Sequence, residues 1–278
     1  MKSKKNLLTF MMFVSFFALC FGQQAKTKTY KVKDVSFTMV YVEGGETVLG
    51  CTSEQGDKGK YIIDGLYIDP VSVTLDNFWI GQTEVTQELW EAVMGENPSQ
   101  NKDNPKQPVT NVSWEECMVF ITRLSGLTGE RFRMPTEAEW EYAARGGMYS
   151  KYYKFSGSND PTEVGWVQEI GAKDENGRPL LGKSPHVVGT KKPNELGIYD
   201  MTGNVSEWCK NGVSNVGLLQ GGDNPQGRSG AEYRIYRGDS FRGIGVGVCQ
   251  RHKFKPDART QGIGLRLARS VKIKMEED

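Results

Sequence analysis

The segment RMPTEAEWEYAARGG, residues 133–147, decides how the chain around it is organised. Thr136 is followed three residues later by Glu139, which is the spacing of a capping box at the start of a helix. Gly146 can adopt the left-handed conformation that ends a helix. The segment therefore predicts a short capped helix, with Trp140 on the face that packs into the core.

On both sides of this helix, short helices and strands are expected to alternate with long loops. Thr86 and Ser113 are expected to cap two further helices. Residues 27–37 and 71–80 are expected to contain strands, and residues 37–49 a pair of strands around Gly44-Gly45. With 33 glycines among 278 residues, the chain can make many turns that need a positive φ. The pattern predicts an α+β fold with little regular secondary structure.

The first residues resemble a signal peptide. Lysines are followed by an apolar stretch that is too short to span a bilayer, and cleavage after Gly22 fits the small-residue rule. A lipid anchor at Cys20 is the alternative, but Leu19 before it is bulky. We expect residues 1–22 to be a signal peptide, residues 27–270 one domain, and residues 271–278 a charged tail. The mature chain would then be exported, to the periplasm or cell surface.

Charge and cysteine content limit the remaining function classes. The net charge is +1 and basic residues form no tract, which argues against nucleic acid as a partner. No second apolar run follows the first, so no transmembrane segment is predicted. Four cysteines would remain after cleavage, with three full disulfide pairings open; their wide spacing does not suit zinc. They are Cys51, Cys117, Cys209 and Cys249.

Two further motifs accompany the helix, and together the three carry a family resemblance. They are GIYDMTGNVSEW at residues 197–208, and RGDSF at 237–241 with GIGLRLA at 262–268. In this order they resemble the formylglycine-generating enzyme (sulfatase-modifying factor) family, from about Val40 to Ala268. The resemblance implies an α+β fold related to that of C-type lectins, and a bacterial source.

The resemblance also implies a calcium site. The family binds a structural calcium ion in the loop that matches residues 200–207, and four positions match its ligands: Asp200, Gly203, Val205 and Glu207. Two carboxylates and backbone carbonyls are the oxygen ligands that calcium prefers. On spacing alone, a turn cap at Asp200 and an arginine pair at Glu207 explain the same residues.

The chain departs from the family at the catalytic centre. The family oxidises a substrate cysteine to formylglycine with oxygen and a copper(I) ion held by two thiolates. Counted from the turn at residues 238–241, the two cysteine positions fall on Gly243 and Val248. Copper is therefore not expected. Cys249 lies one residue further on; we expect it to form a disulfide or to be buried.

Other candidates for catalysis are weak. Ser240 matches a serine beside the family's active site, but serine after a glycine turn is usually a turn residue. The two histidines, His186 and His252, have no carboxylate placed by sequence to orient them, so a catalytic triad is not supported.

Two functions remain open. The first is a non-catalytic module that binds a protein or peptide through residues 241–254, where the resembled enzymes hold their substrate peptide. Its candidate contact residues are Phe241, Arg242, Gln250, Arg251 and His252. The second is a formylglycine-generating oxidase that relies on Cys249 with Cys209.

Overall fold

A computed structural model describes residues 25–52, 70–168, 184–214, 220–228, 230–243 and 247–271. The predicted signal peptide, Cys20 and most of the charged tail lie outside these residues. Within the described ranges, no helix is long and apolar enough to cross a membrane.

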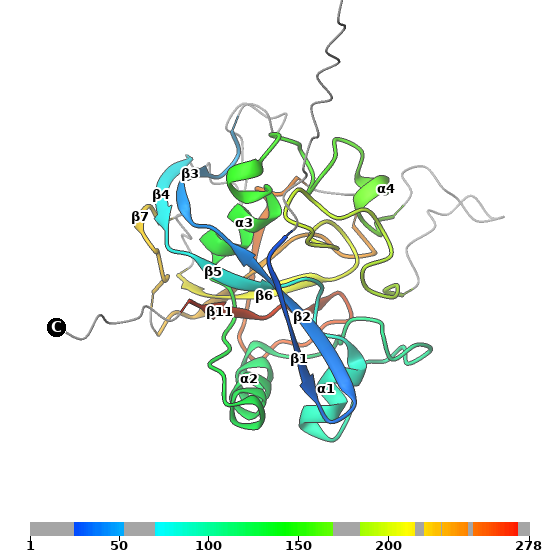
Figure 1. The fold of residues 1–278 in the computed structure, drawn as a ribbon. Coiled ribbons are helices and arrows are strands. Elements are labelled where there is room, and N and C mark those ends of the chain that lie inside the picture. The colour runs from blue at the N-terminus through cyan, green and yellow to red at the C-terminus, as the bar shows by residue number, and fades with distance from the viewer. Residues whose placement is uncertain are drawn as a thin grey trace, which may run out of the picture.

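The described strands form three small sheets (Figure 1). The first has the order β1-β2-β5-β11: β1 (Thr27–Val32), β2 (Val35–Val42), β5 (Phe78–Gly81) and β11 (Ala268–Ser270). The second has the order β10-β6-β8-β9: β10 (Ile263–Leu265), β6 (Ser206–Val213), β8 (Tyr233–Arg237) and β9 (Arg251–Phe254). The third has the order β3-β4-β7: β3 (Gly45–Leu49), β4 (Val71–Leu75) and β7 (Gly222–Asp223). Pairs β10–β6 and β4–β7 are parallel, and the others are antiparallel.

The three helices expected from the sequence begin at the predicted residues, and two further short helices within residues 147–164 were not expected. They are α1 (Gln87–Met94), α2 (Trp114–Thr128), α3 (Glu137–Ala144), the 3-10 helix η2 (Gly147–Tyr149) and α4 (Pro161–Val164). Thr86 caps α1, while Ser113 and Thr136 form complete capping boxes on α2 and α3. Gly146 follows α3 in the left-handed conformation, with φ of 91°. The α+β prediction is confirmed.

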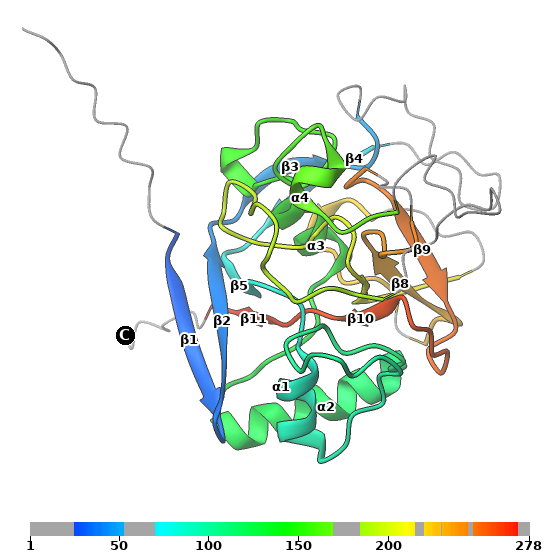
Figure 2. The same ribbon diagram turned by 90° about the vertical axis from the view of Figure 1, so that its right-hand side faces the viewer.

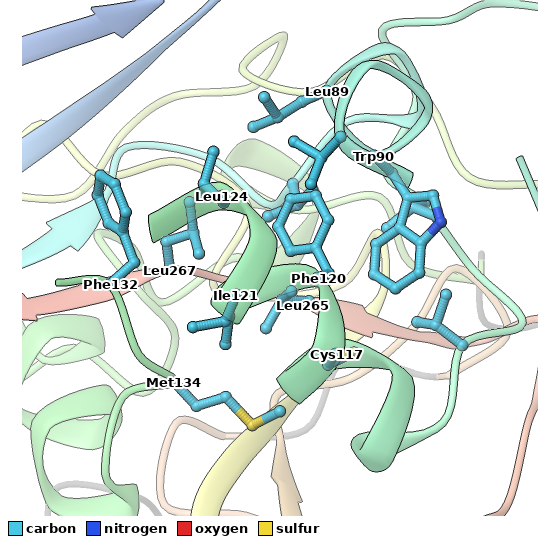
Figure 3. Close-up of a cluster of buried hydrophobic side chains, with 14 of the residues drawn as sticks. Leu89, Trp90, Cys117, Phe120, Ile121, Leu124, Phe132, Met134, Leu265 and Leu267 are labelled. Carbon is cyan, nitrogen blue, oxygen red and sulfur yellow. The ribbon is translucent and has the colours of Figure 1, made fainter. Parts of the chain in front are cut away.

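Two hydrophobic clusters lie on opposite sides of the strands near the C-terminus. In Figures 1 and 2, α1 and α2 lie together on one side of β11, and α3 lies on the other. Figure 3 shows the cluster between α1, α2 and the strands, in which the Trp90 and Phe120 rings stack with centroids 4.7 Å apart. The apolar residues of α3 belong to the second cluster, and every residue of this helix is buried.

The strand pairs expected from local sequence are wrong in one respect. Strand β2 pairs with β1 and β5, whereas β3 pairs with β4, so the strands on either side of Gly44-Gly45 belong to different sheets. Gly44 lies so close to the carbonyl of Leu75 that a Cβ would clash with it, and its N–H donates to Asn77 Oδ1 at 2.8 Å. The predicted strand 71–80 is likewise divided, into β4 and β5.

The Phe120 side chain tests the first cluster. Phe120→Ala removes a fully buried ring that stacks on Trp90, so we expect the free energy of unfolding to fall by about 3–5 kcal/mol. The neighbouring Val119 is 45% exposed on the same helix. Val119→Ala should therefore change the stability by less than about 1 kcal/mol. Equal losses of unfolding free energy for the two variants, measured by urea unfolding, would contradict this packing of α2.

Candidate functional site

A row of charged residues crosses the second sheet beneath α3. Glu207 on β6 lies opposite Arg237 on β8, and Arg237 lies opposite Arg251 on β9. Because residues directly opposite each other share a face, these three side chains point the same way. All three are buried, and two cations side by side would destabilise the sheet without acidic partners.

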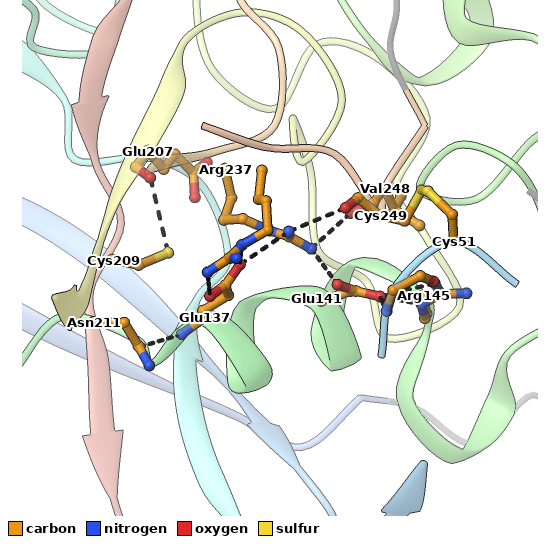
Figure 4. A network of polar contacts seen from close by, with 12 residues as sticks. Cys51, Glu137, Glu141, Arg145, Glu207, Cys209, Asn211, Arg237, Val248 and Cys249 are labelled. Atoms are coloured by element: carbon orange, nitrogen blue, oxygen red, sulfur yellow. Dashed lines mark hydrogen bonds and ion pairs between the residues drawn. A yellow bond between two sulfur atoms is a disulfide. The ribbon is translucent and has the colours of Figure 1, made fainter. Parts of the chain in front are cut away.

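Helix α3 supplies those acidic partners (Figure 4). Glu137 accepts hydrogen bonds from Arg251 Nε at 2.5 Å and Nη2 at 2.6 Å, and pairs with Arg237 Nη1 at 3.2 Å. Glu141 binds Arg237 Nη2, and also Arg145 Nη2 at 2.8 Å. The local sequence indicates only cap and core residues on this helix, so the role of Glu137 and Glu141 in the network was not expected. Their signal is a pair of glutamates four residues apart on a helix face whose other residues are apolar.

Burial and charge act against each other at Glu141. Burial alone would raise the pKa of Glu141, but Arg237 and Arg145, with the N–H of Gly50, hold it below the usual value of 4.5. The carboxylate therefore stays charged in the core at neutral pH, and it joins α3 to β8 and to Gly50, the residue after β3.

The same network fixes the segment around Cys249. Arg237 donates to the backbone carbonyls of Val248 at 3.0 Å and Cys249 at 3.1 Å. Cys249 forms a disulfide with Cys51, at the end of β3, across 198 residues of sequence. This pairing corrects the alternative in which Cys249 acts with Cys209. Cys209 is a free, buried thiol whose pKa burial raises well above its usual range, so neither sulfur is an available thiolate.

In the part of the chain that the structure describes, the hydrogen bonds of Ser240 are local. Its N–H donates to Asp239 Oδ1 at 2.8 Å, and its Oγ accepts from the Arg242 N–H at 3.4 Å. The His252 ring stacks on Tyr236 and the His186 ring stacks on Trp166. Among the described residues, the structure assigns Ser240 no imidazole partner.

The predicted calcium loop is tightly turned. Its two acidic side chains, Asp200 and Glu207, differ in whether their oxygens are free to bind an ion. Asp200, Gly203 and Asn204 all have positive φ. The Glu207 carboxylate is occupied, since it pairs with Arg266 Nη2 at 2.6 Å and accepts from Trp140 Nε1 at 2.6 Å. Arg266 is held in turn by the carbonyls of Gly81 and Tyr199. Glu207 therefore does not fit a calcium ion in this arrangement.

Carboxylate oxygens without a described partner belong to Asp200, within the loop, and to Glu84, which lies far from the loop in the sequence. Asp200 Oδ2 accepts from the Gly189 N–H at 2.6 Å, but its Oδ1 and both oxygens of Glu84 are buried without a hydrogen-bond partner among the described residues. Burial and the Asp200 charge raise the pKa of Glu84 well above its usual range, and burial raises that of Asp200 to about 6. These two acids fit a hard cation better than Glu207 does. In the described part of the chain, however, no three histidine, cysteine or acidic side chains are arranged to hold a metal.

The predicted contact residues 241–254 divide into exposed and buried ones. Arg242 is exposed, with its guanidinium over the Phe241 ring, and Gln250 and His252 are half-buried. Phe241 and Arg251 are buried, so they are not surface contacts. The placement of Arg251 is a correction: its charge requires the buried partner Glu137, which lies far away in the sequence.

Asn204 organises the surface next to Arg242. Its N–H donates to the Trp166 carbonyl at 2.8 Å, and its side chain accepts from the His186 N–H at 2.9 Å. Its own carbonyl accepts from the Phe241 N–H at 2.8 Å. The buried Asn204 thus gathers three separate segments, although the sequence analysis gave it no role.

Comparison with known proteins shows the family of the chain. The model of the sulfatase-modifying factor enzyme 1-like domain matches residues 23–271. The chain belongs to this family. Chaperone protein LppX of Paenibacillus barcinonensis is 36% identical over 217 residues, which cover 63% of this chain and 71% of that protein.

Formylglycine-generating enzymes and a solved structure also resemble the chain. The formylglycine-generating enzyme of Streptomyces coelicolor is 29% identical, over 61% of this chain and 54% of that enzyme. This match spans only about half of the enzyme's length. The structure of Treponema denticola variable protein 1 aligns with a TM-score of 0.73 at 30% identity, and covers 88% of this chain and 99% of that one. The family and the α+β fold expected from the three motifs are thereby confirmed, whereas the relation to C-type lectins and the bacterial source stay predictions.

The buried network predicts acid sensitivity. Because the folded-state pKa of Glu141 is depressed, its contribution to stability is present above pH 4.5 and is lost as the pH falls through the folded pKa. Glu141→Gln should lower the free energy of unfolding at pH 7 by about 3–5 kcal/mol, since two buried cations lose a partner. It should also flatten the loss of stability below pH 4.5. Glu46→Gln, at an exposed residue of β3, is the matched control. An unchanged acid-unfolding profile for Glu141→Gln would contradict the prediction.

Calcium remains a prediction, with a modified set of acidic ligands. If Asp200 and Glu84 hold the ion, calcium at one hundred times its Kd should stabilise the fold by about 2.7 kcal/mol at neutral pH. Glu84→Gln or Asp200→Asn should reduce this shift, whereas Glu207→Ala should lower the melting temperature with or without calcium. A melting temperature that neither calcium nor EDTA changes would exclude the ion.

Proposed function

We propose that this chain is an exported, non-catalytic binding or assembly module of the sulfatase-modifying factor family. The observation that carries the proposal is the disulfide between Cys51 and Cys249. It removes the one cysteine near the family's catalytic positions from thiol chemistry. Those positions themselves are Gly243 and Val248, neither of which can bind copper(I).

The remaining thiols do not offer a substitute pair. Cys117 and Cys209 are both buried, and burial raises the pKa of each well above its usual range. A copper(I) site needs two thiolates that can approach one ion. The alternative function, a formylglycine-generating oxidase, is favoured by the named enzymes among the relatives, but not by the cysteines that the structure describes.

The relative named as a chaperone supports a role in protein binding. We place the contact surface around Arg242, Trp166 and His186, which Asn204 holds together. The Trp166 and His186 rings stack with centroids 3.7 Å apart, and Lys191 Nζ lies 4.1 Å from the Trp166 ring centroid. Arg242 and His186 are exposed. Aromatic and arginine side chains are enriched at protein interfaces, so this surface suits a protein or peptide partner with acidic groups.

The proposed lack of oxidase activity can be tested directly. We expect a Cys-x-Pro-x-Arg peptide to keep its thiol when it is incubated with the purified protein, copper(I) and oxygen, as followed by mass spectrometry. A formylglycine-generating enzyme under the same conditions is the positive control. Conversion of the peptide by this protein, abolished by Cys249→Ser, would contradict the non-catalytic function.

The contact surface is tested by substitution of its exposed cation. Arg242→Ala removes a guanidinium that lies over the Phe241 ring and donates to Gln261 at the surface, so the fold should be unaffected. We expect recovery of cross-linked partners from the native cell envelope to fall severalfold, at an unchanged melting temperature. Arg131→Ala, at another exposed arginine, is the control. Equal recovery with both variants would place the partner elsewhere.

A further inference from the structure

A pocket separate from the contact surface at Arg242 lies where the start of α2 meets β6 and β8. Its volume is about 290 Å³, and the residues that matter are Trp114, Met118, Lys210, Arg228 and Arg234. We call it the Trp114 pocket. It lies at an irregularity of the β6–β8 pairing between Trp208 and Gly212, a type of distortion that is common beside binding sites.

The wall of the Trp114 pocket is built from fixed groups. Trp114 Nε1 donates to the Cys209 carbonyl at 2.9 Å, which holds the indole in one orientation. The Arg234 guanidinium stacks on this indole, 4.1 Å from the ring centroid. Gly212 makes the stack possible, because a Cβ at this position would clash with Arg234 Nη1 and the Arg228 carbonyl.

The cations of the pocket are poorly neutralised. Within the described residues, Arg234 Nε is buried without a hydrogen-bond partner, and burial lowers the pKa of Arg234, partly offset by the negative charge of Glu115. In the same part of the chain, Lys210 Nζ donates only to the neutral Gln226, at 2.7 Å. The exposed Arg228 side chain pairs with no side chain in the described residues. A fourth lining cation, Arg133, is neutralised by Glu139.

We propose that the Trp114 pocket binds an aromatic oxyanion, meaning a phosphate, sulfate or carboxylate group carried on an aromatic ring. Lys210, Arg228 and Arg234 supply the charge-assisted donors that such a group requires. Trp114 and Met118 supply an apolar wall for the ring. The volume lies at the lower end of the range for small-molecule sites, so the ligand is about the size of one substituted ring.

The ligand can be a free small molecule or a modified side chain of a partner protein. The two sources share the same chemistry, and both fit the pocket's opening at the surface, where Met118 and Arg228 are exposed. The proposal does not depend on the contact surface at Arg242, nor on whether the protein is catalytic.

Calorimetric titration of the full mature protein with phenyl phosphate tests the proposal. We expect binding that weakens with added salt, and at least tenfold weaker binding of the neutral analogue benzyl alcohol. Arg228→Gln and Arg234→Gln should each weaken phenyl phosphate binding about tenfold or more. Arg131→Gln, outside the pocket, should bind as the wild type does.

Two further measurements complete the test. One distinguishes a folding defect from a loss of binding, and the other distinguishes a displayed side chain from a free molecule as the ligand. Because Arg234 stacks on Trp114, its variant can also perturb the fold, whereas the exposed Arg228 variant should keep the wild-type melting temperature. A phosphotyrosine peptide that binds at least as tightly as phenyl phosphate assigns the site to a displayed side chain; weaker peptide binding assigns it to a free molecule. No phenyl phosphate binding at millimolar concentration, or wild-type affinity in both arginine variants, would overturn the proposal.

Discussion

The burial of paired charges under α3 is the constraint on which the rest of the fold depends. An isolated buried ion costs several kcal/mol in a protein interior, so each arginine of the sheet row needs an acidic partner at hydrogen-bonding distance. Glu137 and Glu141 meet this need from one helix face, and Glu207 meets it for Arg266. Because the acids come from α3 and β6 and the cations from β8, β9 and the link between β10 and β11, the network forms only when these elements are packed together. It thereby sets the position of α3 on the sheet.

The same interactions decide what the C-terminal segment can do. Arg237 binds the backbone carbonyls of Val248 and Cys249, and the disulfide attaches this segment to the end of β3. A segment that is fixed by a buried arginine and a disulfide is suited to present a surface. It is not suited to cycle between a thiol, a metal complex and a disulfide. Under the proposed non-catalytic function, the family fold is retained while the residues at the family's catalytic positions are replaced, and the nearby Cys249 is tied into a disulfide.

The sequence predicted features that depend on local spacing, and it failed for those that depend on distant partners. The capping boxes of Ser113 and Thr136 rest on residues three apart, and both are present. The strands on either side of Gly44 were correctly expected, but their sheet partners lie far along the chain and were not. Arg251 looked like a surface donor because Glu137, its partner, is 114 residues away. The pairing of Cys51 with Cys249 was one of several that the sequence left open.

The disulfide map of the mature protein tests the central claim, that Cys249 has a structural role, most directly. The protein is digested without reduction after free thiols are alkylated in denaturant, and the linked peptides are identified by mass spectrometry. The structure predicts one linked pair, Cys51 with Cys249, and alkylation of Cys117 and Cys209. Alkylated Cys249, or a link between Cys209 and Cys249, would contradict the account and return these sulfurs to the candidates for catalysis.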